Sequence, residues 1–284
     1  MALTRRRFVR AAGIGAAGAF TTSFIAARGR ENAIWSALDA PLHAVEPGTI
    51  VISSNENPVG PGDTVLKAIR AAFGADGGRP GRYSGGSRNL IDALAKKHGV
   101  KPENIVLGCG STQILRTVTH VFTAKDKPLV ATIPTYEECA DYANLMGHPI
   151  VGVSLDGEFR PDLDKFAAAA KGAGLVFYCN PSNPASTYVG AKATREFLAK
   201  VNSTSPDTTI LVDEAYFDYV TNPDHETFVP LAVQNPRVVV ARTFSKAYGM
   251  AGLRLGYAIG HADTIRQLAS WDAGSGTSFS WWTT

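Results

Sequence analysis

The chain has 284 residues, of which 45% are hydrophobic and 19% charged, and its formal net charge is +3. This length and apolar content predict a globular protein with a large buried core, organised as one domain or one and a half. Much of the positive charge lies in the first ten residues. The rest of the chain therefore lacks the basic excess typical of nucleic-acid binding, and we expect no nucleic-acid partner.

Residues 1–30 contain the arginine pair Arg5 and Arg6, followed by Phe8, Arg10 and an uncharged segment rich in alanine and glycine. This pattern resembles a twin-arginine export signal, which implies a periplasmic or extracytoplasmic location, or a cytoplasmic one if the signal is not used. The alternative is a disordered basic tail. The apolar segment is too short and too weakly apolar for a stable membrane span. The twin-arginine route carries folded proteins, often with a bound cofactor.

Residues 31–75 form a predicted N-terminal arm interrupted by proline and glycine, as in "EPGTIVISSNENPVGPG". Within it, the apolar spacing of "DTVLKAIRAAF" predicts a helix over 63–73, with Asp63 as its cap. The following stretch "GADGGRPGRYSGGS" has the composition of a loop.

Residues 76–284 are predicted to form one large domain. From Asn89 onward, short apolar runs alternate with helical patterns, such as those over 161–171 and 191–201. The runs are continuous rather than alternating, as expected for strands that are covered on both faces. We therefore predict an α/β three-layer sandwich with a mostly parallel sheet. The predicted strands span 104–108, 128–134, 150–155, 175–180, 208–215, 238–243 and 255–260.

The three cysteines, Cys109, Cys139 and Cys179, are widely spaced and include no CxxC pair. Neither a disulfide framework nor a zinc site is supported, and no metal is expected. We expect all three to be small buried apolar residues.

Polar residues follow three of the predicted strands, in "PSNP", "DEAY" and "TFSK". Any one of them is explained by ordinary loop composition, but the set is explained poorly in that way. Because ligands bind at the carboxyl ends of strands in open α/β sheets, the set predicts a binding site there.

Lys246 is the centre of this set. An isolated lysine after a strand is usually a solvated surface charge, but the neighbours of Lys246 are hydroxyl residues, glycines and an arginine: Thr243, Ser245, Gly249, Gly252 and Arg254. Hydroxyls and arginine bind phosphate, and the glycines allow close approach of backbone to a ligand. Pyridoxal 5'-phosphate needs an amine, a phosphate cradle and a carboxylate for its ring nitrogen, for which Asp213 is the candidate.

The chain resembles the fold-type I pyridoxal-phosphate enzymes, and among them the histidinol-phosphate aminotransferase group of the class I/II aminotransferases. The resemblance covers roughly residues 50 to 270 and is carried by motifs in the family's order. These motifs are "NENPVGP", "RYSGG", "GCGSTQ", "PTY", "NPSNP", "DEAYFDY" and "SKAYGMAGLRLGY".

The resemblance implies roles for individual residues near the cofactor ring. Lys246 matches the lysine that binds the cofactor covalently, and Asp213 the residue that keeps the pyridine nitrogen protonated. Tyr216 and Asn183 match groups that hydrogen-bond the phenolic oxygen. Tyr136 matches the aromatic residue that stacks on the ring.

The resemblance also implies a phosphate site and a second subunit. Gly110, Ser111 and Thr112 precede a helical pattern, and the start of a helix favours phosphate. Thr243, Ser245 and Arg254 match residues on the phosphate side. Tyr83 matches a tyrosine that reaches the phosphate from the neighbouring subunit, which implies a homodimer.

Three departures from the family pattern are visible. Ala185 and Ser186 replace the last two residues of the family's "NPTG", a change that cofactor binding should survive. Val59 stands where an aromatic residue is common, which weakens the expectation of histidinol phosphate as substrate. The family continues for roughly another hundred residues, with an arginine that binds the substrate carboxylate, so we expect most of this second domain to be absent here. Aromatic residues near the end should then be exposed: Trp271, Phe279, Trp281 and Trp282.

The resemblance implies an aminotransferase that moves an amino group between an amino acid, or an amino-acid-like phosphate ester, and a 2-oxo acid. The freed Lys246 would move a proton from the substrate α-carbon. Two alternatives stay open: a decarboxylase or lyase of the same fold, and a non-catalytic remnant that binds cofactor or a partner without turnover.

Overall fold

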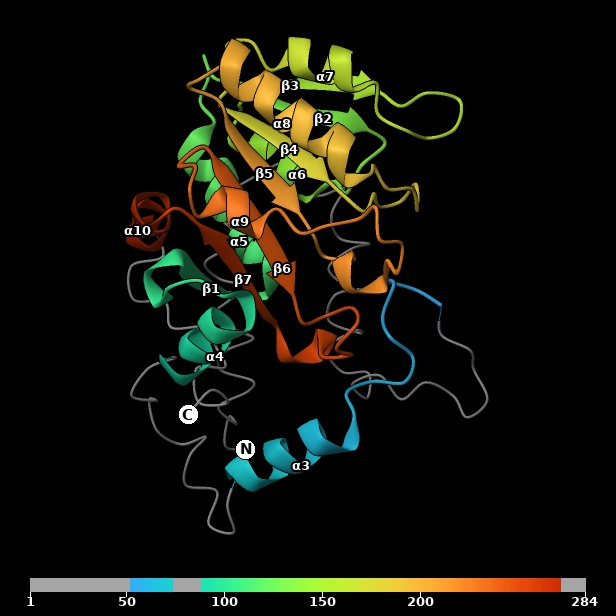
Figure 1. Ribbon diagram of the computed structural model, residues 1–284, viewed down its shortest axis with the longest axis vertical. Coiled ribbons are helices and arrows are strands. Elements are labelled where there is room, and N and C mark those ends of the chain that lie inside the picture. The colour runs from blue at the N-terminus through green and yellow to red at the C-terminus, as the bar shows by residue number, and fades with distance from the viewer. Residues whose placement is uncertain (1–51, 74–87, 272–284) are drawn as a thin grey trace, which may run out of the picture. The chain divides into compact units, whose positions relative to one another are not determined.

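The computed structural model describes residues 52–73 and 88–271, which belong to one compact unit (Figure 1). The predicted export signal, most of the predicted arm, and Tyr83, Phe279, Trp281 and Trp282 lie outside the described residues. Within the described part of the chain, no helix has both the length and the apolar character needed to cross a bilayer.

In the described part of the chain, seven strands form one sheet, and each corresponds to a strand predicted from the sequence. Their order across the sheet is β1-β7-β6-β5-β4-β2-β3 (Figure 1). Strand β7 is antiparallel to both of its neighbours, whereas the other pairings are parallel. The mostly parallel sheet is thereby confirmed. The bounds are Ile105–Cys109 (β1), Leu129–Ile133 (β2), Ile150–Ser154 (β3), Leu175–Cys179 (β4), Thr209–Asp213 (β5), Val238–Thr243 (β6) and Leu255–Gly260 (β7).

Helices cover both faces of the sheet, and each face has its own hydrophobic core. One core packs α5 (Gly110–Phe122), α6 (Glu138–Leu145) and α10 (Ala262–Trp271) on the sheet. The other packs α4 (Arg88–His98), α7 (Leu163–Ala169), α8 (Ala191–Thr204) and α9 (Val229–Ala232) on the opposite face. Adjacent side chains of a strand divide between the cores, so that Phe177 packs in the first and Tyr178 in the second. The predicted three-layer sandwich is confirmed.

The starts of two helices differ in detail from the sequence prediction. Helix α3 (Asp63–Phe73) includes Asp63 in its first turn, so Asp63 is not the residue before the helix. Its charge still complements the positive helix start. Helix α5 begins at Gly110, directly after β1, so Gly110, Ser111 and Thr112 form its first turn rather than preceding it. Three short 3₁₀ helices complete the described elements: Pro102–Asn104 (η2), Phe217–Tyr219 (η3) and Ala251–Leu253 (η4).

The sequence predicted that the three cysteines are buried and that Trp271 is exposed. Cys139 and Cys179 are buried as predicted, but Cys109 is only half-buried because it ends β1 where the chain turns into α5. Trp271 is 60% exposed, as expected.

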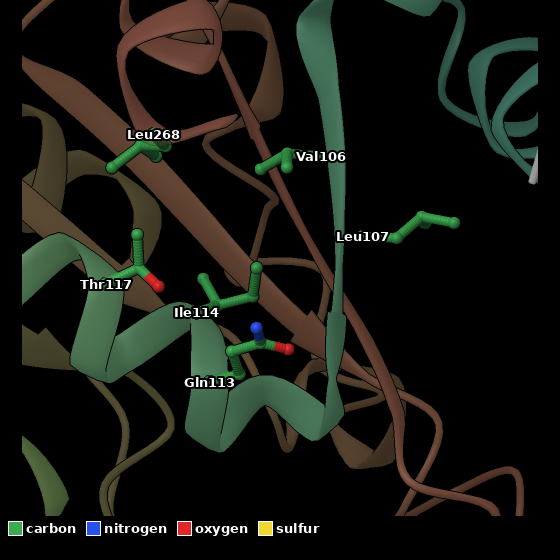
Figure 2. A pocket seen from close by; sticks show the side chains of 6 residues that line it. All are labelled: Val106, Leu107, Gln113, Ile114, Thr117 and Leu268. Atoms are coloured by element: carbon green, nitrogen blue, oxygen red, sulfur yellow. The ribbon is translucent and has the colours of Figure 1, made fainter. Parts of the chain in front are cut away.

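A small cavity lies between β1, α5 and α10 (Figure 2). Its volume is about 10 Å³, which is room for one water at most. Val106 and Leu107 project from opposite sides of β1 at this point, and Gln113, Ile114, Thr117 and Leu268 complete the lining. With mostly apolar walls and this size, it is a packing gap in the core.

Candidate active site

A cavity of about 530 Å³ lies where β4, β5 and β6 end and α5 begins. This volume is within the range of small-molecule sites. The structure brings most of the sequence-predicted site residues to its wall: Ser111, Thr112, Tyr136, Asn183, Asp213, Tyr216, Thr243, Ser245, Lys246 and Arg254. Gly110 lies directly behind it, against Arg254.

Asp213 ends β5 and is only 3% exposed, yet it lines the cavity. Its carboxylate accepts a hydrogen bond from the backbone N–H of Ala215 at 3.1 Å, and among the described residues it forms no ion pair. Burial raises the pKa of Asp213 to about 7; nearby Glu214 also raises it, whereas the Ala215 hydrogen bond and Lys246 lower it. A buried carboxyl without a cation is suited to hold a positively charged group of a ligand.

The next residue, Glu214, shows what a satisfied buried carboxylate looks like in this fold. Arg242 binds it through an ion pair of 2.6 Å, and both side chains are almost fully buried. The backbone N–H of Phe228 and the hydroxyl of Thr227 donate to the two carboxylate oxygens at 2.7 and 2.8 Å. Burial raises the pKa of Glu214 and Arg242 lowers it. Glu214 is therefore a structural group, and Asp213 is the carboxyl left for a ligand.

Lys246 lies in the turn after β6, with its amine at the cavity. Its Nζ donates a hydrogen bond to the backbone oxygen of Ser54 at 2.8 Å and lies 5.6 Å from the centre of the Tyr216 ring. Burial lowers the pKa of Lys246; Glu56 and Asp213 raise it, and Arg254 lowers it. A lowered pKa increases the share of neutral amine, which is the nucleophilic form.

The start of α5 and Arg254 form a positively charged end of the cavity. The N–H of Gly110 donates to the Arg254 backbone oxygen at 2.9 Å, and a Cβ on Gly110 would lie 2.5 Å from the guanidinium. Gly256 on β7 is equally constrained, because its Cβ would lie 2.3 Å from the Ser111 backbone nitrogen. These close approaches place the first turn of α5, where the N–H groups of Ser111 and Thr112 have no partner within the helix, beside an arginine. Such an arrangement favours anions.

Hydroxyl groups complete this end. Thr243 accepts a hydrogen bond from the Ser245 backbone N–H at 3.1 Å, which fixes the turn that leads to Lys246. On the other wall, burial raises the pKa of Tyr136. The cavity is thus polar at the α5 end and aromatic beside it.

Several cavity residues were not assigned roles from the sequence: Ser54, Asn55, Glu56, Glu137 and Cys179. The first three belong to the matched motif "NENPVGP" or directly precede it, so the motif was the available signal. Their contact with the cavity depends on a backbone path that no local pattern shows.

Gly249 and Gly252 were predicted to let the backbone approach a ligand, but neither glycine lines the cavity. Gly249 has φ 65° and lies against the backbone of Gly60, where a Cβ would come within 2.2 Å, whereas a Cβ on Gly252 would meet open space. Gly249 therefore permits packing of the N-terminal segment rather than approach to a ligand.

These residues fit pyridoxal phosphate, the cofactor expected from the sequence. The fit rests on three features of one cavity: an amine with a lowered pKa, a buried carboxyl without a counter-ion, and an anion-binding end. Together they match the aldehyde, ring nitrogen and phosphate of that molecule.

Comparison with known proteins identifies relatives over the same region. The pattern of the family described as "Aminotransferase class I and II" matches residues 47–279. A histidinol-phosphate aminotransferase from Moorella thermoacetica is 38% identical over 223 residues, covering 77% of this chain and 55% of the relative. An aromatic amino acid aminotransferase from Nocardia farcinica is 36% identical over 227 residues, covering 78% of this chain and 62% of the relative.

A solved structure agrees with the sequence relatives. The histidinol-phosphate aminotransferase from Sinorhizobium meliloti, in complex with pyridoxal-5'-phosphate, superposes with a TM-score of 0.72 at 29% identity. The match covers 81% of this chain and 61% of that protein, so this chain spans only part of the length of its relatives. The fold, the site and these similarities together show that the chain belongs to the class I and II aminotransferase family.

Proposed function

We propose that this protein is a pyridoxal-phosphate-dependent aminotransferase. The observation that carries the proposal is that one cavity is lined by Lys246 and by the buried Asp213, which forms no ion pair among the described residues. The far end of this cavity, at Arg254 and the start of α5, is suited to bind an anion. Its relatives bear aminotransferase names, which supports an amino acid, or an amino-acid-like phosphate ester, as donor and a 2-oxo acid as acceptor.

Bound pyridoxal phosphate supplies an electron sink for the electron pair released when the substrate loses its α-hydrogen. Residues of this chain would bind the cofactor and transfer the proton. The phosphate would be held by Arg254, the α5 N-terminus, Thr243 and Ser245, and Asp213 would keep a proton on the ring nitrogen. The Lys246 amine would hold the cofactor and, once free, would take the proton from the substrate α-carbon.

The first prediction tests the attachment residue. Protein incubated with pyridoxal phosphate and then reduced with borohydride should carry a phosphopyridoxyl group on Lys246, because its partly buried amine has a lowered pKa. Peptide mass spectrometry locates the label. Lys97, whose amine lies over the Tyr248 ring, supplies the matched control: Lys97→Ala should label normally and Lys246→Ala should not. Labelling of other lysines at the same level would contradict the proposal.

We also propose that residues 1–30 direct export, on the basis of the arginine pair, Phe8 and Arg10 before an uncharged segment. A reporter fused behind these residues should leave the cytoplasm only in cells with a working twin-arginine route. Changing Arg5 and Arg6 together to lysine should retain the reporter inside. Export that is unaffected by this change would rule out the signal.

A further inference from the structure

The segment Ser54–Asn57 crosses the cavity beside Lys246. Ser54 and Asn55 both have left-handed backbone conformations, with φ 61° and 51°. The Ser54 oxygen accepts the hydrogen bond from Lys246, and Asn57 Nδ2 donates to the Ala247 backbone oxygen at 3.1 Å. The segment is thus held to the turn that carries Lys246 at both of its ends.

Asn55 projects from this segment to two side chains of the opposite wall. Its Nδ2 lies 3.1 Å from the Tyr216 hydroxyl oxygen and 3.4 Å from Asn183 Oδ1. Tyr216 follows β5 and Asn183 follows β4. One amide nitrogen therefore links three segments that are distant in sequence.

In the structure, the contacting atom of Asn55 is its amide nitrogen, which sets the direction of both contacts. An amide NH₂ group has two protons and no acceptor, so Asn55 donates in both contacts. The Tyr216 oxygen accepts and keeps its own O–H proton for another partner. Asn183 accepts through Oδ1, and its NH₂ group donates to no other residue in the described part of the chain. Both side chains line the cavity, so both remaining donors are available to a ligand there.

We infer that Asn55 is a positioning residue that orients the Tyr216 hydroxyl and the Asn183 amide as paired hydrogen-bond donors to an oxyanion on the cofactor ring. The inference rests on the proposed function, since the oxyanion is the phenolic oxygen of pyridoxal phosphate. If Asn55 presented its oxygen instead, both donors would be consumed by it. The two arrangements therefore have opposite effects on the oxyanion.

The test is a pH titration of the absorbance of pyridoxal phosphate bound to the purified protein. Hydrogen bonds donated to the phenolic oxygen favour its ionised form and lower the pH midpoint of the absorbance change. Asn55→Gly removes the side chain while tolerating the left-handed backbone. It should raise the midpoint by about one pH unit, the scale of one hydrogen bond, and weaken cofactor binding.

Two further variants distinguish the loss of the Asn55 hydrogen bonds from a general loosening of the segment Ser54–Asn57. Asn57→Ala removes the other side-chain anchor of the segment, without a contact to Tyr216, and should leave the midpoint unchanged. In a Tyr216→Phe background, Asn55→Gly should shift the midpoint less than it does alone, because part of its effect acts through the hydroxyl.

An unchanged or lowered midpoint in Asn55→Gly, or an equal rise in Asn57→Ala, would overturn the inference. Failure of the proposed function is distinguishable. If wild-type protein carries no label on Lys246, both the proposed function and this inference are rejected. If Lys246 is labelled normally but the midpoint of Asn55→Gly equals that of the wild type, only the inference is rejected.

Discussion

Asp213→Asn is expected to slow removal of the substrate α-hydrogen by about 100- to 1,000-fold, the usual loss when one preorganised charge is taken from an active site. Asparagine keeps the shape of the side chain but no longer holds a proton on the ring nitrogen by its charge. Stopped-flow absorbance after mixing the cofactor-loaded protein with amino acid measures the rate. Labelling of Lys246 should persist in the variant, and a wild-type rate would contradict the role of Asp213.

The same substitution should stabilise the protein without cofactor at pH 8. The pKa of Asp213 is raised from 3.8 to about 7 on folding, so the folded state binds more protons than the unfolded state between these values. Stability from this group is therefore lost as the pH rises from about 4 to 7. The contribution of Asp213 to the free energy of unfolding falls by at most roughly 4 kcal/mol over this pH range. Urea unfolding at pH 5 and 8 measures the free energy of unfolding at each pH. The difference between these two free energies should be smaller in Asp213→Asn than in the wild type.

Arg242→Met is expected to have the largest effect on folding. It leaves the buried carboxylate of Glu214 without a counter-ion, which costs about 3–5 kcal/mol of the free energy of unfolding. Arg237 pairs with Asp207 at 3.8 Å on the exposed surface and is the matched control; Arg237→Met should cost less than about 1 kcal/mol. Adding Glu214→Gln to Arg242→Met should recover much of the loss in chemical denaturation. Equal losses in the two single variants would refute this view of the buried pair.

The sheet was predictable because burial on both faces leaves continuous apolar runs. Runs such as 175–180 and 238–243 end at polar residues, and the parallel arrangement brings those ends to one edge. The same logic brought Asn183, Asp213 and Lys246 to one cavity. The details of helix starts were less predictable. Gly110 enters α5 directly from β1 because its φ of 72° allows a tight turn that no apolar periodicity reveals.

The contribution of Ser54 and Asn55 was not predictable from local pattern. Their side of the cavity is set by their own left-handed backbone conformations and by the packing of Gly60, further along the same segment, against Gly249. Both are properties of the tertiary structure. Ser186 shows the opposite situation. It takes φ 56° at the position of the family's glycine, and Asn183 still lines the cavity. A position suited to glycine can thus be filled by serine where the surrounding turn imposes the conformation.

The strand order has a consequence for when the site appears during synthesis. The first strand, β1, pairs with the last, β7, and the contact between Lys246 and Ser54 joins residues 192 positions apart. Contacts of such separation form late, because the entropy of closing long loops must be overcome before they stabilise the chain. A chain still emerging from the ribosome has the helix start at Gly110 but neither the amine nor Arg254. We therefore expect the cofactor to bind after most of the sheet has formed, on a framework that has already folded.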